Sequence, residues 1–188
     1  MFYPRTSDAD TRAVLALYAD PAAPRSAPTP TDWQRLRDKL ARVAEFAPTV
    51  AGVDGHRWCP GTPRLAAEIE AHERRLGRSL PAEYREFLRE LGDRAPGPNG
   101  RLRGLFEDHG DDASTCARWD SVARLNEHSG WGPLVRGALA LAHRCTWGTF
   151  VLALDGPAPG TIWLSLSQGS RVHPTGLGVF AWYEHWLD

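Results

Sequence analysis

The sequence predicts an α+β fold, in which N-terminal helices pack on one face of a mostly antiparallel, twisted β-sheet and a further helix closes the chain. Apolar residues recur at helical spacing through residues 32–91, three strand-like segments occupy much of residues 138–167, and helical spacing returns at residues 179–186. Helices followed by strands are typical of segregated layers, whereas a parallel sheet requires alternating helices and strands.

The N-terminal part of the chain predicts two helices separated by a linker. Residues 10–19 carry apolar residues at helical spacing, which predicts a short helix. Prolines concentrate in residues 21–30, where the missing amide donors favour a semi-rigid linker. Thr31 and Gln34 match the capping-box pattern. Trp33, Leu36 and Leu40 follow at helical spacing, which predicts an amphipathic helix over 32–46.

Two consecutive helices joined by a tight turn are predicted next. Thr62 followed by Pro63 is typical of a helix start, and Gly77 stands where a left-handed residue ends a helix. Pro81 begins the second helix and Gly92 ends it. The expected apolar stripes are Leu65, Ile69, His72 and Leu76 in the first helix and Tyr84, Phe87, Leu88 and Leu91 in the second.

The second half of the sequence predicts the strands of the β-sheet and further helices that pack on it. Residues 92–101, "GDRAPGPNGR", predict a loop, residues 102–106 a short edge strand and residues 114–130 a helix. In the last strand, Ile162 alternates with Trp163, which predicts one buried and one half-exposed face. Strands are expected at 138–142, 149–155 and 161–167, and the closing helix carries Val179, Trp182, Tyr183 and Trp186 on one face.

Composition narrows the class of protein. A chain of 188 residues suffices for one domain with a core and an appendage, which we place at 62–188 and 1–61. A net charge of −1 gives no general basic surface for nucleic acid, and no apolar run is long enough to span a membrane. The N-terminus lacks the order of a signal peptide, and three scattered cysteines form no disulfide framework. We therefore expect a cytoplasmic protein.

Three motifs, in order along the chain, resemble the SUKH superfamily. "IEAHERRLGRSLPAEYREFLRELG" resembles its signature helix pair, "GTFVLALDGPAPGTIWL" its hairpin and "VFAWYEHWL" its terminal helix. The resemblance covers about residues 63–187. The loop "GDRAPGPNG" and the segment "RCTWG" depart from the family's glycine-rich patterns at those places.

The resemblance implies a binding protein without a catalytic site. Bacterial members are mostly immunity proteins that bind and neutralise toxins, commonly nucleases, and other members are intracellular regulators or scaffolds. The expected partner is accordingly a protein, either a cognate toxin domain or a cellular regulatory protein. Fold alone does not determine function, so both alternatives stay open.

The chemistry of individual residues predicts neither an enzyme nor a metal or cofactor site. His56, Cys59, His143 and Cys145 lack the paired spacing of a structural zinc site. Cys145 with His143 lacks an evident orienting acid, and no nucleotide-binding or hydrolase motif occurs.

The acidic segment "FEDHGDD" is the candidate partner-binding site. It carries Glu107, Asp108, Asp111 and Asp112, whose order differs from that of a calcium-binding loop. A solvated acidic loop is one interpretation. The other is an acidic patch that meets the basic, phosphate-binding surface of a nuclease.

Overall fold

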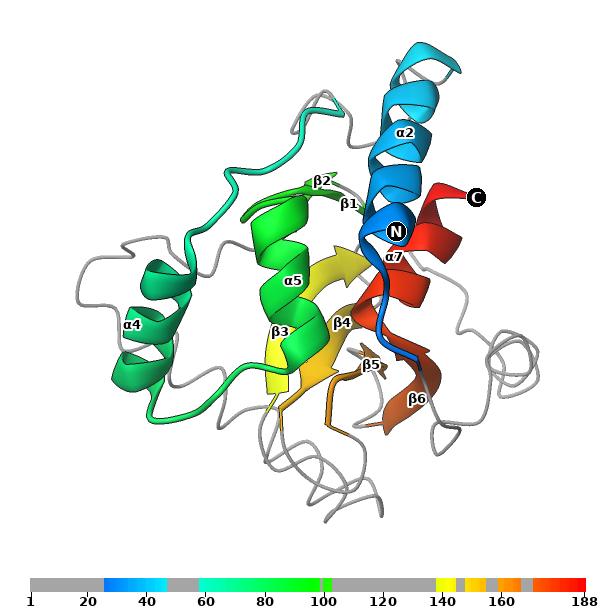
Figure 1. Ribbon diagram of the computed structural model, residues 1–188. Coiled ribbons are helices and arrows are strands. Elements are labelled where there is room, and N and C mark those ends of the chain that lie inside the picture. The colour runs from blue at the N-terminus through cyan, green and yellow to red at the C-terminus, as the bar shows by residue number, and fades with distance from the viewer. Residues whose placement is uncertain are drawn as a thin grey trace.

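The computed structural model describes residues 26–46, 58–98, 100–102, 138–144, 148–154, 159–166 and 171–188. The α+β class is confirmed, because helices from both ends of this part of the chain accompany an antiparallel sheet (Figure 1). The elements are α2 (Pro30–Phe46), α4 (Ala66–Leu76), α5 (Ala82–Glu90), β1 (Pro96–Gly97), β2 (Gly100–Arg101), β3 (Ala138–Arg144), β4 (Gly148–Ala153), β5 (Thr161–Leu166), β6 (Arg171–Gly178) and α7 (Val179–Leu187).

The main sheet has the strand order β3-β4-β5-β6, and each neighbouring pair is antiparallel. The strands predicted at 138–142, 149–155 and 161–167 are present as β3, β4 and β5, but β6 was not predicted. The sequence of β6, "RVHPTGLG", contains a proline and two glycines, which disfavour strands. Its pairing with β5 is irregular between Thr161 and Trp163, and Gly176 opposite this region has a φ of 71°. The buried Thr175 hydroxyl donates a 2.6 Å hydrogen bond to the Ile162 carbonyl, which holds the irregular region in place.

Both faces of the sheet are buried at its centre. Phe150 and Leu164 are register partners and belong to the hydrophobic core beneath the helices. Val151 and Trp163 are partners on the opposite face, yet they are 0% and 3% exposed. The prediction of a half-exposed face at Trp163 was therefore wrong. The Trp163 indole N–H donates to the Thr161 hydroxyl at 2.7 Å, so this buried polar group has its partner.

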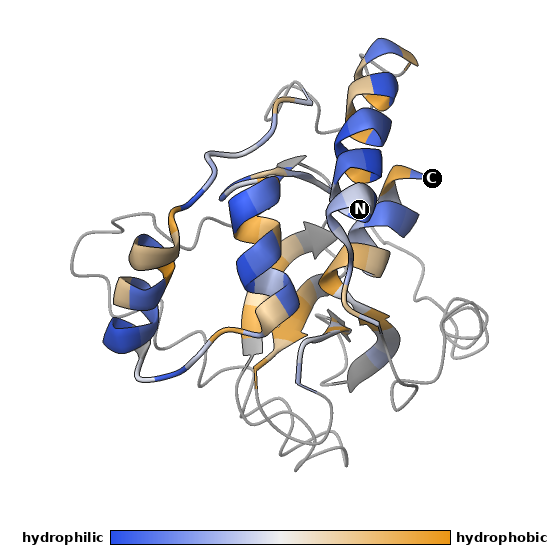
Figure 2. Ribbon diagram, viewed as in Figure 1, coloured by the Kyte–Doolittle hydropathy of each residue, from blue (hydrophilic) through white to orange (hydrophobic). Residues whose placement is uncertain are grey.

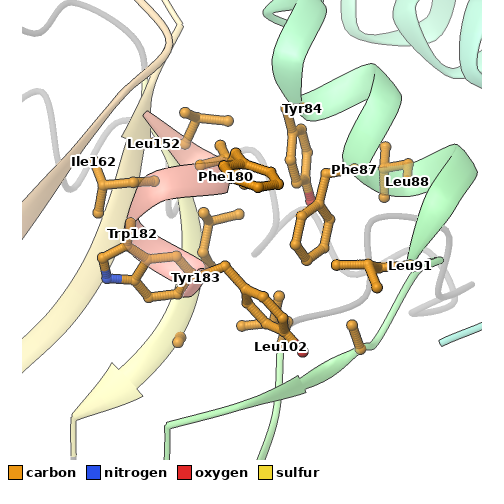
Figure 3. Close-up of a cluster of buried hydrophobic side chains, with 14 of the residues drawn as sticks. Tyr84, Phe87, Leu88, Leu91, Leu102, Leu152, Ile162, Phe180, Trp182 and Tyr183 are labelled. Carbon is orange, nitrogen blue, oxygen red and sulfur yellow. The ribbon is translucent and has the colours of Figure 1, made fainter. Parts of the chain in front are cut away.

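The core lies between the sheet and the helices. Helix α7 contacts β5 and β6, while α5 and α2 pack on α7 and α4 packs on α5 (Figure 1). Aromatic and aliphatic side chains of α5 point toward those of α7 (Figure 3). The rings of Phe87 and Tyr183 meet edge to face at 5.0 Å, and Phe150 reaches Trp182 from the sheet at 5.2 Å. This packing explains the helical spacing in both segments.

Helix α2 belongs to the same core. Trp33, Leu36 and Leu40 are at most 3% exposed, and Trp33 meets the Phe180 ring of α7 at 5.0 Å. Figure 2 shows hydrophobic positions of α2 alternating with hydrophilic ones along the helix. The Arg35 guanidinium lies 2.8 Å from the Glu184 carboxylate of α7.

Two predicted helix starts were wrong. Helix α2 is capped by Thr29 and Asp32, because the Asp32 carboxylate accepts the Thr29 N–H at 2.9 Å and the Thr29 hydroxyl lies 3.3 Å from the Asp32 N–H. The Thr29 hydroxyl also donates to the Asp32 carboxylate at 2.6 Å, and this hydrogen bond, followed by the one from the Thr29 N–H, lowers the pKa of Asp32. Helix α4 begins at Ala66 rather than after Thr62, whose backbone instead pairs with Asp93 in an isolated bridge.

The predicted loop at 92–101 contains a short hairpin. β1 and β2 pair antiparallel, with Pro96 opposite Arg101 and Gly97 opposite Gly100. Of the edge strand predicted at 102–106, only Leu102 lies within the described residues, and it is buried. The helices predicted at 10–19 and 114–130 lie outside the described residues.

Candidate functional site

The acidic residues predicted to bind a partner lie outside the described residues. Glu107, Asp108, Asp111 and Asp112 all fall in the stretch 103–137. Their assignment as a binding patch therefore stays a prediction.

The residues considered for metal or thiol chemistry are only partly described. His56 and Cys145 lie outside the described residues, and Cys59 is exposed. Within the part of the chain that the structure describes, no group of three or more His, Cys, Asp or Glu side chains is placed to hold a metal ion. Among the described helices, none is long and apolar enough to cross a membrane.

The structure has a groove between α4 and α5 that the sequence patterns did not predict. Its volume is about 130 Å³, and we call it the α4–α5 groove. Buried Ile69 and small Ala66 provide its apolar part, and charged side chains from both helices surround them. The lining residues are Ala66, Ile69, Glu70, Arg85, Glu86 and Arg89.

The buried carboxylate of Glu73 fixes the two walls of this groove relative to each other. Its two oxygens accept hydrogen bonds from the Arg85 guanidinium, each at 2.8 Å. The Leu80 N–H, in the turn between the helices, also donates to Glu73. Gly77 ends α4 with a φ of 64°, a left-handed conformation that glycine adopts without steric cost. One side chain thus joins α4, the turn and α5.

The segment before α4 is held against the end of α5 by backbone contacts. The Gly61 N–H donates to the Leu91 carbonyl at 2.8 Å, and Thr62 and Asp93 exchange hydrogen bonds of 3.0 and 2.8 Å. A Cβ on Gly61 would lie 2.1 Å from the Asp93 carbonyl oxygen, so this close approach requires glycine. These contacts fix the chain that enters α4 relative to the end of α5.

The groove's charges are unequally compensated. Arg85 is bound by Glu73, and Arg89 lies 2.9 Å from Glu86. Glu70 is exposed, and no described residue gives its carboxylate an ion pair or hydrogen bond. The lining side chains Glu70, Glu86, Arg85 and Arg89 together carry no net charge. Both guanidinium groups are engaged by carboxylates, so the lining charge without an ion pair among the described residues is the negative charge of Glu70.

Exposure along α4 also differs from prediction. Ile69 and His72 are buried as the stripe predicts, but Leu65 is 72% exposed beside the groove residue Ala66. Burial lowers the pKa of His72, and the nearby Arg75 lowers it further. The groove residues could have been suspected from the charged positions 85, 86 and 89, which lie between the apolar positions of α5, although sequence alone does not show that α4 lies beside them.

The size of the groove limits what it can hold. Pockets for small molecules and cofactors usually enclose about 300–1,000 Å³. The α4–α5 groove, at about 130 Å³, fits a single long side chain instead. Its geometry supports contact with another macromolecule.

Comparison with known proteins identifies one family. A family model described as SMI1 / KNR4 family (SUKH-1) matches residues 65–170. The matched range contains α4, α5 and β1 to β5, whereas α2, β6 and α7 lie outside it. A search of curated proteins found no match.

Proposed function

Because the chain belongs to the SMI1 / KNR4 family (SUKH-1), we propose that it is a non-enzymatic protein-binding module, an immunity protein that binds and neutralises a toxin domain. The family match carries this proposal. The α4–α5 groove supports it, because its size and mixed polarity suit one anchoring side chain of a protein partner.

A nuclease is the toxin class that the charge pattern favours. A nuclease needs a basic surface to hold phosphates. The acidic segment with Asp108, Asp111 and Asp112 would attract such a surface, which raises the association rate and disfavours acidic partners.

Affinity capture from the native lysate tests the proposal. The tagged full chain would be used in about 150 mM salt, where long-range charge attraction is screened, and bound proteins identified by mass spectrometry. We expect one dominant partner with a C-terminal toxin domain, bound one to one and without turnover. Capture of a housekeeping assembly instead would contradict the immunity assignment.

Charge reversal tests the acidic patch separately. Replacing Asp108, Asp111 and Asp112 with lysine should abolish tight binding of the captured toxin domain. Glu45→Lys, at an exposed position of α2, is the matched control and should leave binding unchanged. Nanomolar binding by the triple variant would exclude the patch but not the function.

A regulatory or scaffold protein of the same family is the second candidate. The observation that favours it is the Pro-rich segment before α2, which would carry a docking arm away from the core. Because one face of α2 packs into the core, the arm would be limited to residues 1–25. Deleting those residues should then abolish partner binding, and an unchanged set of partners would rule this role out.

A further inference from the structure

We propose that the α4–α5 groove binds one long cationic side chain, a lysine or arginine, of the protein partner. The aliphatic stem would lie on Ala66 and Ile69 and the charged end would reach Glu70. This inference rests on the proposed function, since it specifies the chemistry of the partner's surface.

The dimensions of the groove suit such a side chain. An engineered apolar cavity of about 150 Å³ holds one benzene molecule. The α4–α5 groove is slightly smaller, at about 130 Å³, and is lined by side chains of two helices. Lysine and arginine combine an apolar stem with a charged end, so they cover apolar surface while their charge stays near water.

The carboxylate of Glu70, unpaired among the described residues, favours a cation over an anion. Arg85 is held by the buried Glu73 carboxylate, and Arg89 is within 2.9 Å of Glu86. The carboxylate left for a partner is that of Glu70. An incoming glutamate would meet like charge from Glu70, while the Arg85 and Arg89 guanidinium groups are already engaged by carboxylates, which disfavours it.

A neutral aliphatic side chain would also be disfavoured. It could fill the apolar part beside Ala66 and Ile69, but it would displace water from Glu70 without supplying a partner. Removing a charged group from water without a partner costs free energy. A cation both fills the apolar part and compensates the carboxylate.

Nuclear magnetic resonance with the full ¹⁵N-labelled chain tests this directly. The probes are N-acetyl-arginine amide and N-acetyl-lysine amide, with N-acetyl-norleucine amide and N-acetyl-glutamate amide as matched controls. We expect saturable shifts of backbone amides in 66–70 and 85–89 for the cationic probes alone. Absence of saturable shifts there, or equal binding of the norleucine probe, would overturn the proposal.

Two substitutions test the carboxylate and the apolar part of the groove separately. Glu70→Gln should weaken binding of the arginine probe by about two- to fivefold, the range for one exposed ion pair. Ala66→Leu should fill the groove and remove binding, while Glu45→Gln on α2 should have no effect. Circular dichroism spectra and melting temperatures would show that all variants are folded. Unchanged probe affinity in Glu70→Gln would contradict the assignment of the carboxylate.

The captured toxin domain separates this inference from the proposed function. Tight toxin binding that is unaffected by Glu70→Arg and Ala66→Leu would overturn the groove assignment and leave the function intact. Binding of the cationic probes without capture of any toxin would support the groove chemistry and count against the toxin-neutralising function.

Discussion

Glu73 is the residue on which the geometry of the groove depends. It belongs to α4, but its carboxylate accepts hydrogen bonds from the Leu80 N–H of the turn and from Arg85 of α5. A charged group that is 8% exposed is costly to bury unless it is fully paired, and these contacts supply the pairing.

Glu73→Ala should therefore destabilise the protein by about 2 kcal/mol, because the buried Leu80 N–H loses its acceptor. The Arg85 side chain is 39% exposed, so water can solvate its guanidinium in this variant, which limits the loss of stability. Glu86→Ala is the matched control: its pair with Arg89 is exposed on both sides and should contribute less than about 0.5 kcal/mol. Urea unfolding of both variants measures the difference, and equal losses would contradict this account.

His72 predicts a pH dependence of stability. Burial, followed by Arg75, lowers its pKa in the folded protein below the ordinary value of 6.5, although Asp93 and Glu73 oppose the shift. The unfolded chain therefore binds more protons once the pH falls below about 6.5, and the free energy of unfolding decreases.

Between about pH 8 and pH 5.5, the wild-type protein should lose more stability than His72→Gln, which cannot titrate there. Chemical unfolding at each pH gives both curves. Parallel curves for the two proteins would show that the folded and unfolded states bind protons at this histidine equally.

At the scale of secondary-structure elements, the sequence patterns identified which segments are helical more accurately than they identified the first residue of each helix. The apolar spacing of Trp33, Leu36 and Leu40 identified α2 because spacing reports the buried face directly. Its cap was misplaced because Thr31–Gln34 and Thr29–Asp32 both fit a capping pattern, and only the structure shows which hydrogen bonds form. β6 escaped prediction because its stability comes from pairing with β5 and not from its own residues.

The two competing caps can be distinguished by substitution. Thr29→Ala should destabilise the protein by about 1 kcal/mol, because the side chain that interacts with Asp32 is lost. Thr31→Ala, at an exposed position in the first turn of α2, should be nearly neutral. Thermal unfolding of the pair checks this, and a larger effect at Thr31 would restore the cap predicted from sequence.

At the scale of the whole molecule, the described core extends beyond the family match. The match begins at residue 65, yet Trp33 and Leu36 of α2 join the cluster that contains Phe180 of α7. The α+β class and the family could be predicted from the sequence, since both depend on ordered local patterns. The α4–α5 groove could not be predicted, because a groove depends on which side chains remain between two helices after their apolar stripes are buried.

The N-terminal limit of the segment needed for cooperative folding is the subject of the last prediction. Deleting residues 1–25 leaves the Thr29–Asp32 cap and all of α2, so the chain should melt cooperatively at the wild-type temperature. Deleting residues 1–46 removes three core side chains and exposes Phe180 and Phe87, which contact Trp33. Leu36→Ala alone should cost about 3 kcal/mol because it leaves a cavity, so loss of the whole helix should abolish cooperative unfolding. Differential scanning calorimetry distinguishes the two truncations. A sharp transition for the shorter chain, close to the wild-type temperature, would show that the remaining core is sufficient and that α2 is an accessory.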